Sequence, residues 1–202
     1  MIGIINYGIG NIRSIRTVYE KLGIDSQLVS NSEDLKKVSK IILPGVGSFD
    51  YAMTLLNKSG MRDELETQVI TNKKPVLGIC VGMQMMANRS DEGLSKGLGW
   101  IDGEVKSFIV NNNSKLPHMG WNNVQEIQNS LLFKNLDSNS RFYFLHSFYF
   151  CSNQREFEIG KTYFQHDYTS VVNKDNIYGG QFHPEKSHQW GVELLNNFYK
   201  LS

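Results

Sequence analysis

The chain has 202 residues, of which 40% are hydrophobic and 20% are charged, a balance typical of a globular protein with a sizeable core. The formal net charge of +1 gives no electrostatic basis for binding nucleic acid or a membrane surface. No apolar run approaches the roughly 20 residues that a transmembrane helix needs, and the N-terminus lacks a signal-peptide pattern, so we expect a cytoplasmic protein without a membrane partner.

The first half of the chain alternates short apolar runs with helical patterns. Strands are predicted at residues 2–7, 24–30 and 75–80, and a further strand at 40–49 runs into a glycine-rich loop. Helical spacing is present at 11–22, where Gly23 ends it, at 31–38, in two segments up to about 71, and from 81 onward. Strands that are apolar throughout and separated by helices predict a parallel sheet covered on both faces.

The second half has a different character. The segments 97–110, 141–152 and 158–185 are rich in strand-forming residues and turn residues, and residues 191–202 form an amphipathic helical pattern. The chain shows no internal repeat and no linker composition. We therefore expect a single domain over residues 1–202, in which an antiparallel extension continues the parallel sheet.

The stretch "PVLGICVGMQ" predicts a cysteine nucleophile. Cys80 ends an apolar strand and lies between Gly78 and Gly82. A sharp turn from the strand into a helix would place the thiol at the helix N-terminus, where the dipole favours the reactive thiolate. We expect one glycine to permit the tight turn and the other to permit close packing, as in nucleophile elbows. An isolated cysteine is more often a core residue, so this interpretation needs a base nearby.

The stretch "GGQFHPEKS" supplies a candidate base. His183 follows another glycine-bounded apolar strand, and Glu185 lies two residues beyond it. In an extended segment, residues two apart lie on the same side, so Glu185 could hold one ring nitrogen while the other faces Cys80. Cysteine with histidine and a third orienting group is the arrangement that nucleophilic catalysis requires.

The glycine-rich stretch "PGVGSF" is a candidate oxyanion loop. Backbone N–H groups near Val46 and Gly47 could join that of Val81 in stabilising a tetrahedral intermediate. A phosphate-binding loop is a weaker alternative, because the stretch lacks the Gly-Lys-Ser/Thr ending and "GIGN" near the start lacks the full dinucleotide fingerprint.

Together these motifs resemble the class I, or triad, glutamine amidotransferases. "PHMGWN" and "FLHSFYF" extend the similarity toward the glutaminase subunits of imidazole glycerol phosphate synthases, over the full length of the chain. The resemblance implies a flavodoxin-like three-layer α/β/α domain and a triad of Cys80, His183 and Glu185. It also implies that the substrate L-glutamine is held by further residues: Gln84, Glu92, His146, Ser147 and Phe148.

The resemblance implies a partner as well. Glutaminases of this kind need no metal or cofactor, and they pass ammonia to a cyclase subunit with a (β/α)₈-barrel fold, forming a heterodimer in histidine biosynthesis. Trp121 is a candidate interface residue, because aromatic side chains are enriched at interfaces. Lys186, directly after Glu185, is a candidate interface cation. The relatives often have tyrosine where this chain has Phe148, and aspartate where it has Asn6.

Other functions remain as alternatives at this point. A cysteine peptidase or deglycase-like hydrolase would also need an elbow cysteine and a histidine, although Gln84, four residues past the cysteine, suits glutamine. A non-catalytic binding subunit is disfavoured by the complete set of three candidate catalytic residues. A paralogous amidotransferase could feed ammonia to a barrel partner in a surface-sugar pathway instead.

Overall fold

The computed structural model describes residues 1–109 and 115–201, and it confirms an α/β/α fold with an antiparallel extension. Val110 and Ser202, the last residues of two predicted segments, lie outside the described residues. Among the residues described, no helix is long and apolar enough to cross a membrane.

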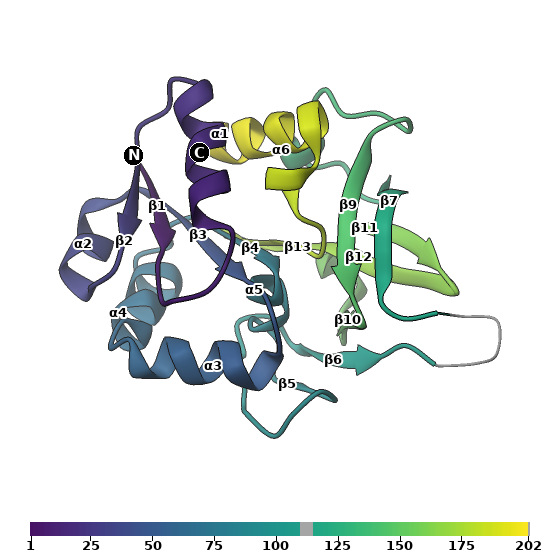
Figure 1. Cartoon of the computed structure of the whole chain (residues 1–202), viewed down its shortest axis with the longest axis horizontal. Coiled ribbons are helices and arrows are strands. Elements are labelled where there is room, and N and C mark those ends of the chain that lie inside the picture. The colour runs from purple at the N-terminus through teal and green to yellow at the C-terminus, as the bar shows by residue number, and fades with distance from the viewer. Residues whose placement is uncertain (110–114, 202) are drawn as a thin grey trace.

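Five parallel strands form one side of the larger sheet (Figure 1). In their spatial order they are β2 (Ser26–Val29), β1 (Ile2–Ile5), β3 (Lys40–Gly45), β4 (Val76–Cys80) and β13 (Ile177–Gly180). This is the strand order of flavodoxin-like sheets, in which the loops at the carboxyl ends of the strands form the binding crevice. Strands β1 and β4 are buried throughout and β3 is buried after Lys40, which explains their continuous apolar runs.

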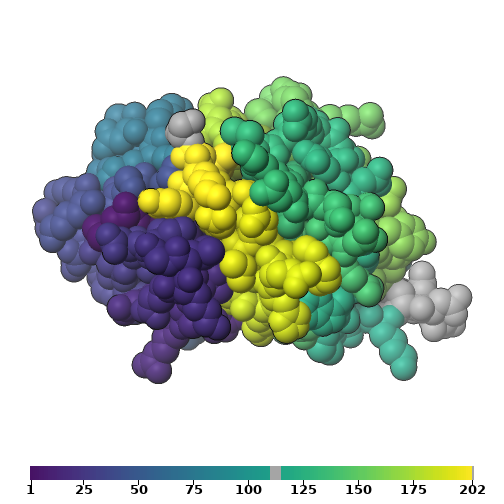
Figure 2. Space-filling view, turned by 90° about the horizontal axis from the view of Figure 1, so that it is seen from above, coloured from purple at the N-terminus to yellow at the C-terminus, as the bar shows by residue number. Residues whose placement is uncertain are grey.

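Helices cover both faces of these strands. Figure 1 shows α1 and α6 on one face and α3 and α4 on the other. The helical elements are α1 (Ile12–Lys21), α2 (Ser32–Lys37), α3 (Phe49–Lys58), α4 (Arg62–Glu66), a π-helical turn (Thr67–Thr71), α5 (Val81–Gln84) and α6 (His188–Lys200). In Figure 2, α1 (purple) and α6 (yellow) lie side by side, and the hydroxyl of Tyr19 donates to the carbonyl of Leu195 across them.

Two helix boundaries follow local sequence signals, and two others differ from the boundaries predicted from the sequence. Asn31 caps α2 by accepting a hydrogen bond from the Asp34 N–H, and Gly23 ends α1 with a φ of +68°. The helix after Cys80 is shorter than expected, since α5 ends at Gln84. Helix α6 begins at His188, three residues before the predicted start.

The extension is antiparallel, as predicted. Beyond β13 the sheet continues through the antiparallel strands β12 (His166–Lys174), β10 (Phe148–Ser152) and β6 (Gly103–Ser107). The short strand β5 (Arg89–Ser90) is an exception, because it pairs with β6 in parallel. Two further strands, β11 (Glu158–Phe164) and β8 (Gln125–Glu126), join through β12. A separate antiparallel pair is formed by β7 (His118–Asn123) and β9 (Arg141–His146), and single 3₁₀ turns occupy Leu131–Phe133, Arg155–Phe157 and Pro184–Lys186.

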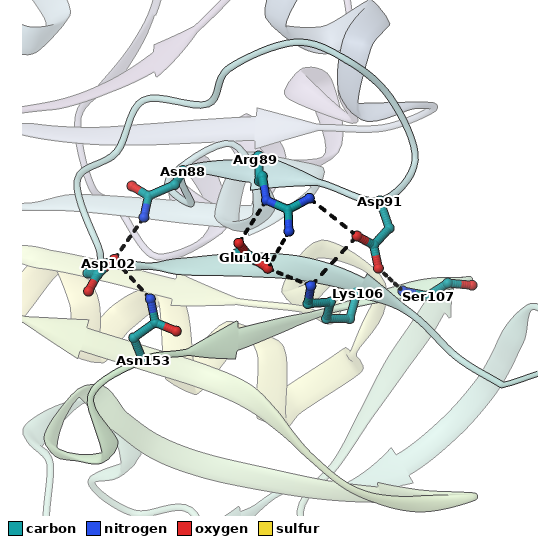
Figure 3. Close-up of polar contacts among 8 residues, drawn as sticks. All are labelled: Asn88, Arg89, Asp91, Asp102, Glu104, Lys106, Ser107 and Asn153. Carbon is teal, nitrogen blue, oxygen red and sulfur yellow. Dashed lines mark hydrogen bonds and ion pairs between the residues drawn. The ribbon is translucent and has the colours of Figure 1, made fainter.

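A network of charged side chains joins β5 and β6 at the surface (Figure 3). Glu104 accepts from Arg89 at 2.7 Å and pairs with Lys106 at 2.5 Å, and both cations also approach Asp91. Hydrogen bonds to Lys106 and Arg89 lower the pKa of Glu104. Exposed ion pairs stabilise little individually. They connect Arg89 and Asp91, which precede Glu92, to Glu104 and Lys106 of β6.

Candidate active site

Cys80 lies at a sharp turn between β4 and α5. Its backbone has φ +55° and ψ −113°, a conformation that L-residues rarely adopt and that clusters at functional sites. The turn therefore occurs at the cysteine itself, and the prediction that a neighbouring glycine supplies it is wrong. Both glycines serve close packing instead: a Cβ at Gly82 would lie 1.9 Å from the Leu43 carbonyl oxygen, and one at Gly78 would lie 2.7 Å from that of Gly82.

His183 and Glu185 form a buried pair beside Cys80. Nδ1 of His183 lies 2.9 Å from Oε1 of Glu185, and the imidazole also interacts electrostatically with Cys80. The extended geometry assumed for this segment is wrong, because residues Pro184–Lys186 form a 3₁₀ turn, and it is this turn that brings Glu185 back to the ring. The Ser187 hydroxyl donates to the His183 carbonyl at 2.6 Å and holds the turn closed.

The charges around His183 favour its protonated form. Burial lowers its pKa, but the negatively charged Cys80 sulfur and the Glu185 carboxylate together raise it to about 10. His183 is 3% exposed, so little water screens these interactions. At neutral pH the site can therefore hold an imidazolium next to Cys80, and a neighbouring cation favours the thiolate, the reactive form of cysteine.

Asn11 is a site residue that the sequence reasoning missed. Its Nδ2 donates to Oε1 of Glu185 at 2.7 Å, from the loop that follows β1. As a motif, "GIGN" shows only an incomplete dinucleotide fingerprint. Its position after an apolar parallel strand was the available signal, because the carboxyl ends of neighbouring strands share one edge of the sheet.

A cavity of about 480 Å³ opens next to Cys80. It is lined by most of the predicted site residues and by three that were not predicted, Asn11, Pro117 and Leu145. The predicted residues that line it are Val46, Gly47, Cys80, Val81, Gln84, Glu92, His146, Ser147, Phe148, His183 and Lys186. Glu185 lies behind His183, with its side chain 1% exposed, and Trp121 lies outside the cavity lining.

The candidate oxyanion donors come from two neighbouring strand ends. Gly45 pairs with Cys80 in the parallel register of β3 and β4, so the loop carrying Val46 and Gly47 begins beside the nucleophile. Gly47 has φ +84°, which favours glycine at this position. Val81 is the first residue of α5, where a backbone N–H has no partner within the helix.

Gln84 and Glu92 are both fixed by other groups. Nε2 of Gln84 donates to the Phe148 carbonyl and to Oε1 of Gln181, each at 3.0 Å. Glu92 accepts at 2.8 Å from the N–H of Phe49, at the end of the glycine-rich loop. Because the carbonyl of residue 148 makes the contact with Gln84, phenylalanine can replace tyrosine there without losing it. Asn6 bonds to Ser30 and is not among the residues that line the cavity.

His146 has its ring nitrogens occupied by protein partners. Nδ1 donates to the Phe148 carbonyl at 2.7 Å, while Nε2 lies 3.1 Å from the Tyr168 hydroxyl. Burial, with smaller effects of His118 and His183, lowers its pKa to about 3, although the Phe148 carbonyl opposes this. His118 lies 3.2 Å from the same hydroxyl, and burial lowers its pKa to about 4. The hydrogen bonds of these two neutral rings hold the 146–148 segment in place.

Trp121 and Lys186 lie on the surface next to the cavity. Trp121, in β7, is 37% exposed and stacks on His188 with the rings 4.9 Å apart. The ammonium of Lys186 lies 5.7 Å from the centre of the Tyr143 ring. Their role at an interface stays a prediction.

Comparison with known proteins identifies the class of enzyme to which this fold and site belong. The family described as "Glutamine amidotransferase class-I" matches residues 3–201, and the chain belongs to this family. The structure of PurLQS from Thermotoga maritima has the same fold, with a TM-score of 0.75 at 18% identity over 98% of this chain and 96% of that chain.

Relatives that match over the full length of the chain identify its family within this class. The chain is 48% identical over its whole length to imidazole glycerol phosphate synthase subunit HisH of Bdellovibrio bacteriovorus, all of which is covered. It is 47% identical to subunit HisH 2 of Methanococcus maripaludis, over 99% of each chain. The chain is therefore a glutamine amidotransferase of the HisH family.

Proposed function

We propose that this chain, acting as one glutamine amidotransferase domain over residues 1–202, is the glutaminase subunit of imidazole glycerol phosphate synthase in the cytoplasm. The observation that carries the chemistry is the buried set of Cys80, His183 and Glu185 beside a cavity. The names of the relatives give the enzyme and imply a second subunit, and the pathway that we propose for this chain is histidine biosynthesis.

In the proposed mechanism the Cys80 thiolate attacks the side-chain amide carbon of glutamine. The N–H of Val81 and those near Val46 and Gly47 stabilise the tetrahedral oxyanion, and losing one such donor typically costs about 10²–10³ in rate. His183 protonates the departing nitrogen, so ammonia leaves and a glutamyl thioester remains. His183 then takes a proton from water as the water attacks the thioester, which releases glutamate and restores the thiol.

Selection of glutamine follows from the donors and acceptors that remain available in the cavity. Both N–H groups of Gln84 are used by protein acceptors, so its oxygen is the atom left for a substrate donor. Glu92 adds a negative charge at the cavity wall. We infer that these two groups bind the α-ammonium of the substrate, while the backbone of Ser147 and Phe148 borders its other side.

The face formed by β7 and β9 is the proposed docking surface for a cyclase subunit of (β/α)₈-barrel fold. Met119 pairs with Leu145 in the register of the two strands, and Trp121 pairs with Tyr143. Met119 and Leu145 are 62% and 39% exposed. Since Leu145 also lines the cavity, a partner on this face would meet the exit of the active site. Ammonia released there would be protected from protonation in bulk water.

The test compares glutamine with ammonia as the nitrogen source. Cys80→Ala should abolish glutamate release by the assembled complex, because no thioester can form. The same complex should still make product from ammonium salt at raised pH. Glutamate release by Cys80→Ala would contradict the proposed nucleophile, and an inactive complex with ammonia would show that the chain does more than deliver nitrogen. A barrel partner from a surface-sugar pathway that co-purifies with the chain would favour the paralogue alternative.

A further inference from the structure

Gln181 is a completely buried glutamine next to the nucleophile, and neither the triad nor the substrate contacts assign it a role. It follows β13, and its backbone N–H donates to the Ser170 carbonyl at 2.9 Å. Its side-chain Nε2 lies 3.7 Å from Sγ of Cys80, within hydrogen-bonding distance for sulfur. Its Oε1 accepts from Nε2 of Gln84 at 3.0 Å. The amide thus connects the nucleophile to a residue of the cavity wall.

The orientation of this amide is determined by Gln84. One N–H of Gln84 donates to the Phe148 carbonyl and the other to the oxygen of Gln181. Because the oxygen of Gln181 is engaged on that side, its NH₂ group must face Cys80. Reversing the amide would place an NH₂ group against the NH₂ group of Gln84 and leave buried donors without acceptors, which is costly.

An N–H donor at this position matters because the other groups around the sulfur have opposite effects on the stability of the thiolate. The Leu145 carbonyl oxygen lies 4.0 Å from Sγ, where it accepts from a thiol and repels a thiolate. His183 favours the thiolate, but it must give up its proton to the departing nitrogen during the reaction. Gln181 is a neutral donor that keeps its hydrogens throughout. Hydrogen bonds to charged acceptors are stronger than those between neutral groups.

We propose that Gln181 is a catalytic residue that stabilises the Cys80 thiolate by donating an N–H to its sulfur, and that Gln84 positions this amide in addition to lining the cavity. The proposal rests on Cys80 being the nucleophile of the proposed function. It predicts that removing the Gln181 donor makes the thiolate harder to form, even when no glutamine is present.

The experiment measures the rate at which iodoacetamide alkylates Cys80 as a function of pH, in the full chain carrying Cys151→Ser, because Cys151 is exposed and would also react. Gln181→Met removes the donor with an apolar side chain of similar length, and Gln181→Glu replaces it with a carboxylate. We expect the midpoint of the alkylation profile to rise by about one pH unit in Gln181→Met and further in Gln181→Glu. Gln84→Met should shift it in the same direction by less.

Gln68 provides a matched control, since it is 5% exposed and lies in the π-helical turn after α4. Gln68→Met should leave the midpoint unchanged. Thermal unfolding of every variant identifies any that do not fold, and the Gln84→Met profile gives the same readout if both Gln181 variants fail. Midpoints that stay within about 0.2 pH unit of the parent value, or an equal shift in Gln68→Met, would overturn the proposal. Cys80→Ala separates the two ideas, because retained glutamate release there would contradict the proposed function itself.

Discussion

Asn11 and Glu185 are 174 residues apart in the sequence and are joined by a hydrogen bond of 2.7 Å from Nδ2 to Oε1. The same carboxylate oxygen accepts from Nδ1 of His183. Asn11 therefore fixes the group that orients the catalytic imidazole, from a loop that lines the cavity. The loop after β1 thus belongs to the catalytic arrangement, although it contains no group that reacts.

We predict that Asn11→Ala lowers kcat for glutamine roughly tenfold with little change in KM, because the Glu185 carboxylate loses a donor that holds it toward His183. Steady-state glutamate release by the complex measures both constants. Asn6→Ala, in the same loop region but bonded to Ser30, should retain the parent rate. A rise in KM at constant kcat in Asn11→Ala would instead indicate that Asn11 binds substrate.

The second prediction concerns the titration of His183. Its native pKa of about 10 lies above the ordinary value near 6.5, so its contribution to stability is complete below pH 6.5 and is lost as the pH rises through about 10. The charge of the Cys80 sulfur raises this pKa more than Glu185 does. NMR titration of the ring should therefore give a lower midpoint in Cys80→Ala than in the parent. Equal midpoints would show that the sulfur carries no charge.

Acid stability should depend on His118 and His146. Their native pKa values, about 4 and about 3, lie below that of an unfolded histidine, so the unfolded state binds protons that the native state does not. The free energy of unfolding should fall as the pH falls from 6.5 toward 4. His118→Phe keeps a ring between Phe144 and Phe164. In this variant the slope of the unfolding free energy against pH should be smaller, by up to the contribution of one bound proton. Urea unfolding at several pH values measures the slopes, and parallel slopes would refute this origin.

Asp50 is expected to act on substrate binding through the loop that carries Glu92. Its carboxylate accepts from the N–H groups of Leu94 and Ser95, each at 2.9 Å. Asp50→Ala should raise KM for glutamine roughly three- to tenfold and change kcat less, because Glu92 loses its support. Gly93→Ala should act similarly, since a Cβ there would lie 2.2 Å from the Asp50 carboxylate. Asp25→Ala is the exposed control, and unchanged KM in both test variants would exclude this role.

The last prediction concerns the docking surface on β7 and β9. Met119→Glu introduces a charge into an exposed apolar position, and Trp121→Ala removes an aromatic side chain that is typical of interface centres. Each should weaken assembly with the cyclase subunit at least tenfold, as measured by calorimetric titration. Tyr51→Ala, 55% exposed on α3, should bind normally. Normal assembly of both β7 variants would place the interface elsewhere.

Much of the fold and part of the site follow from local patterns in the sequence. The apolar runs at β1, β3 and β4 predict buried parallel strands because a sheet covered on both faces has no polar side. The glycines around Cys80 and the short spacing from His183 to Glu185 indicate a nucleophile and its base. These predictions depend on residues within one turn or one strand of each other, so no knowledge of distant contacts is needed.

Other features were decided only by the tertiary structure. The tight turn falls at Cys80 itself, whereas Gly82 is required by the close approach of β3. Only the folded sheet brings β3 to this position. Asn11 reaches Glu185, and Gln181 reaches both Cys80 and Gln84, across more than 90 residues of sequence. Such contacts form where strands far apart in the chain end side by side. A linear pattern records the chemistry of each residue but does not record which strand ends the folded sheet makes neighbours.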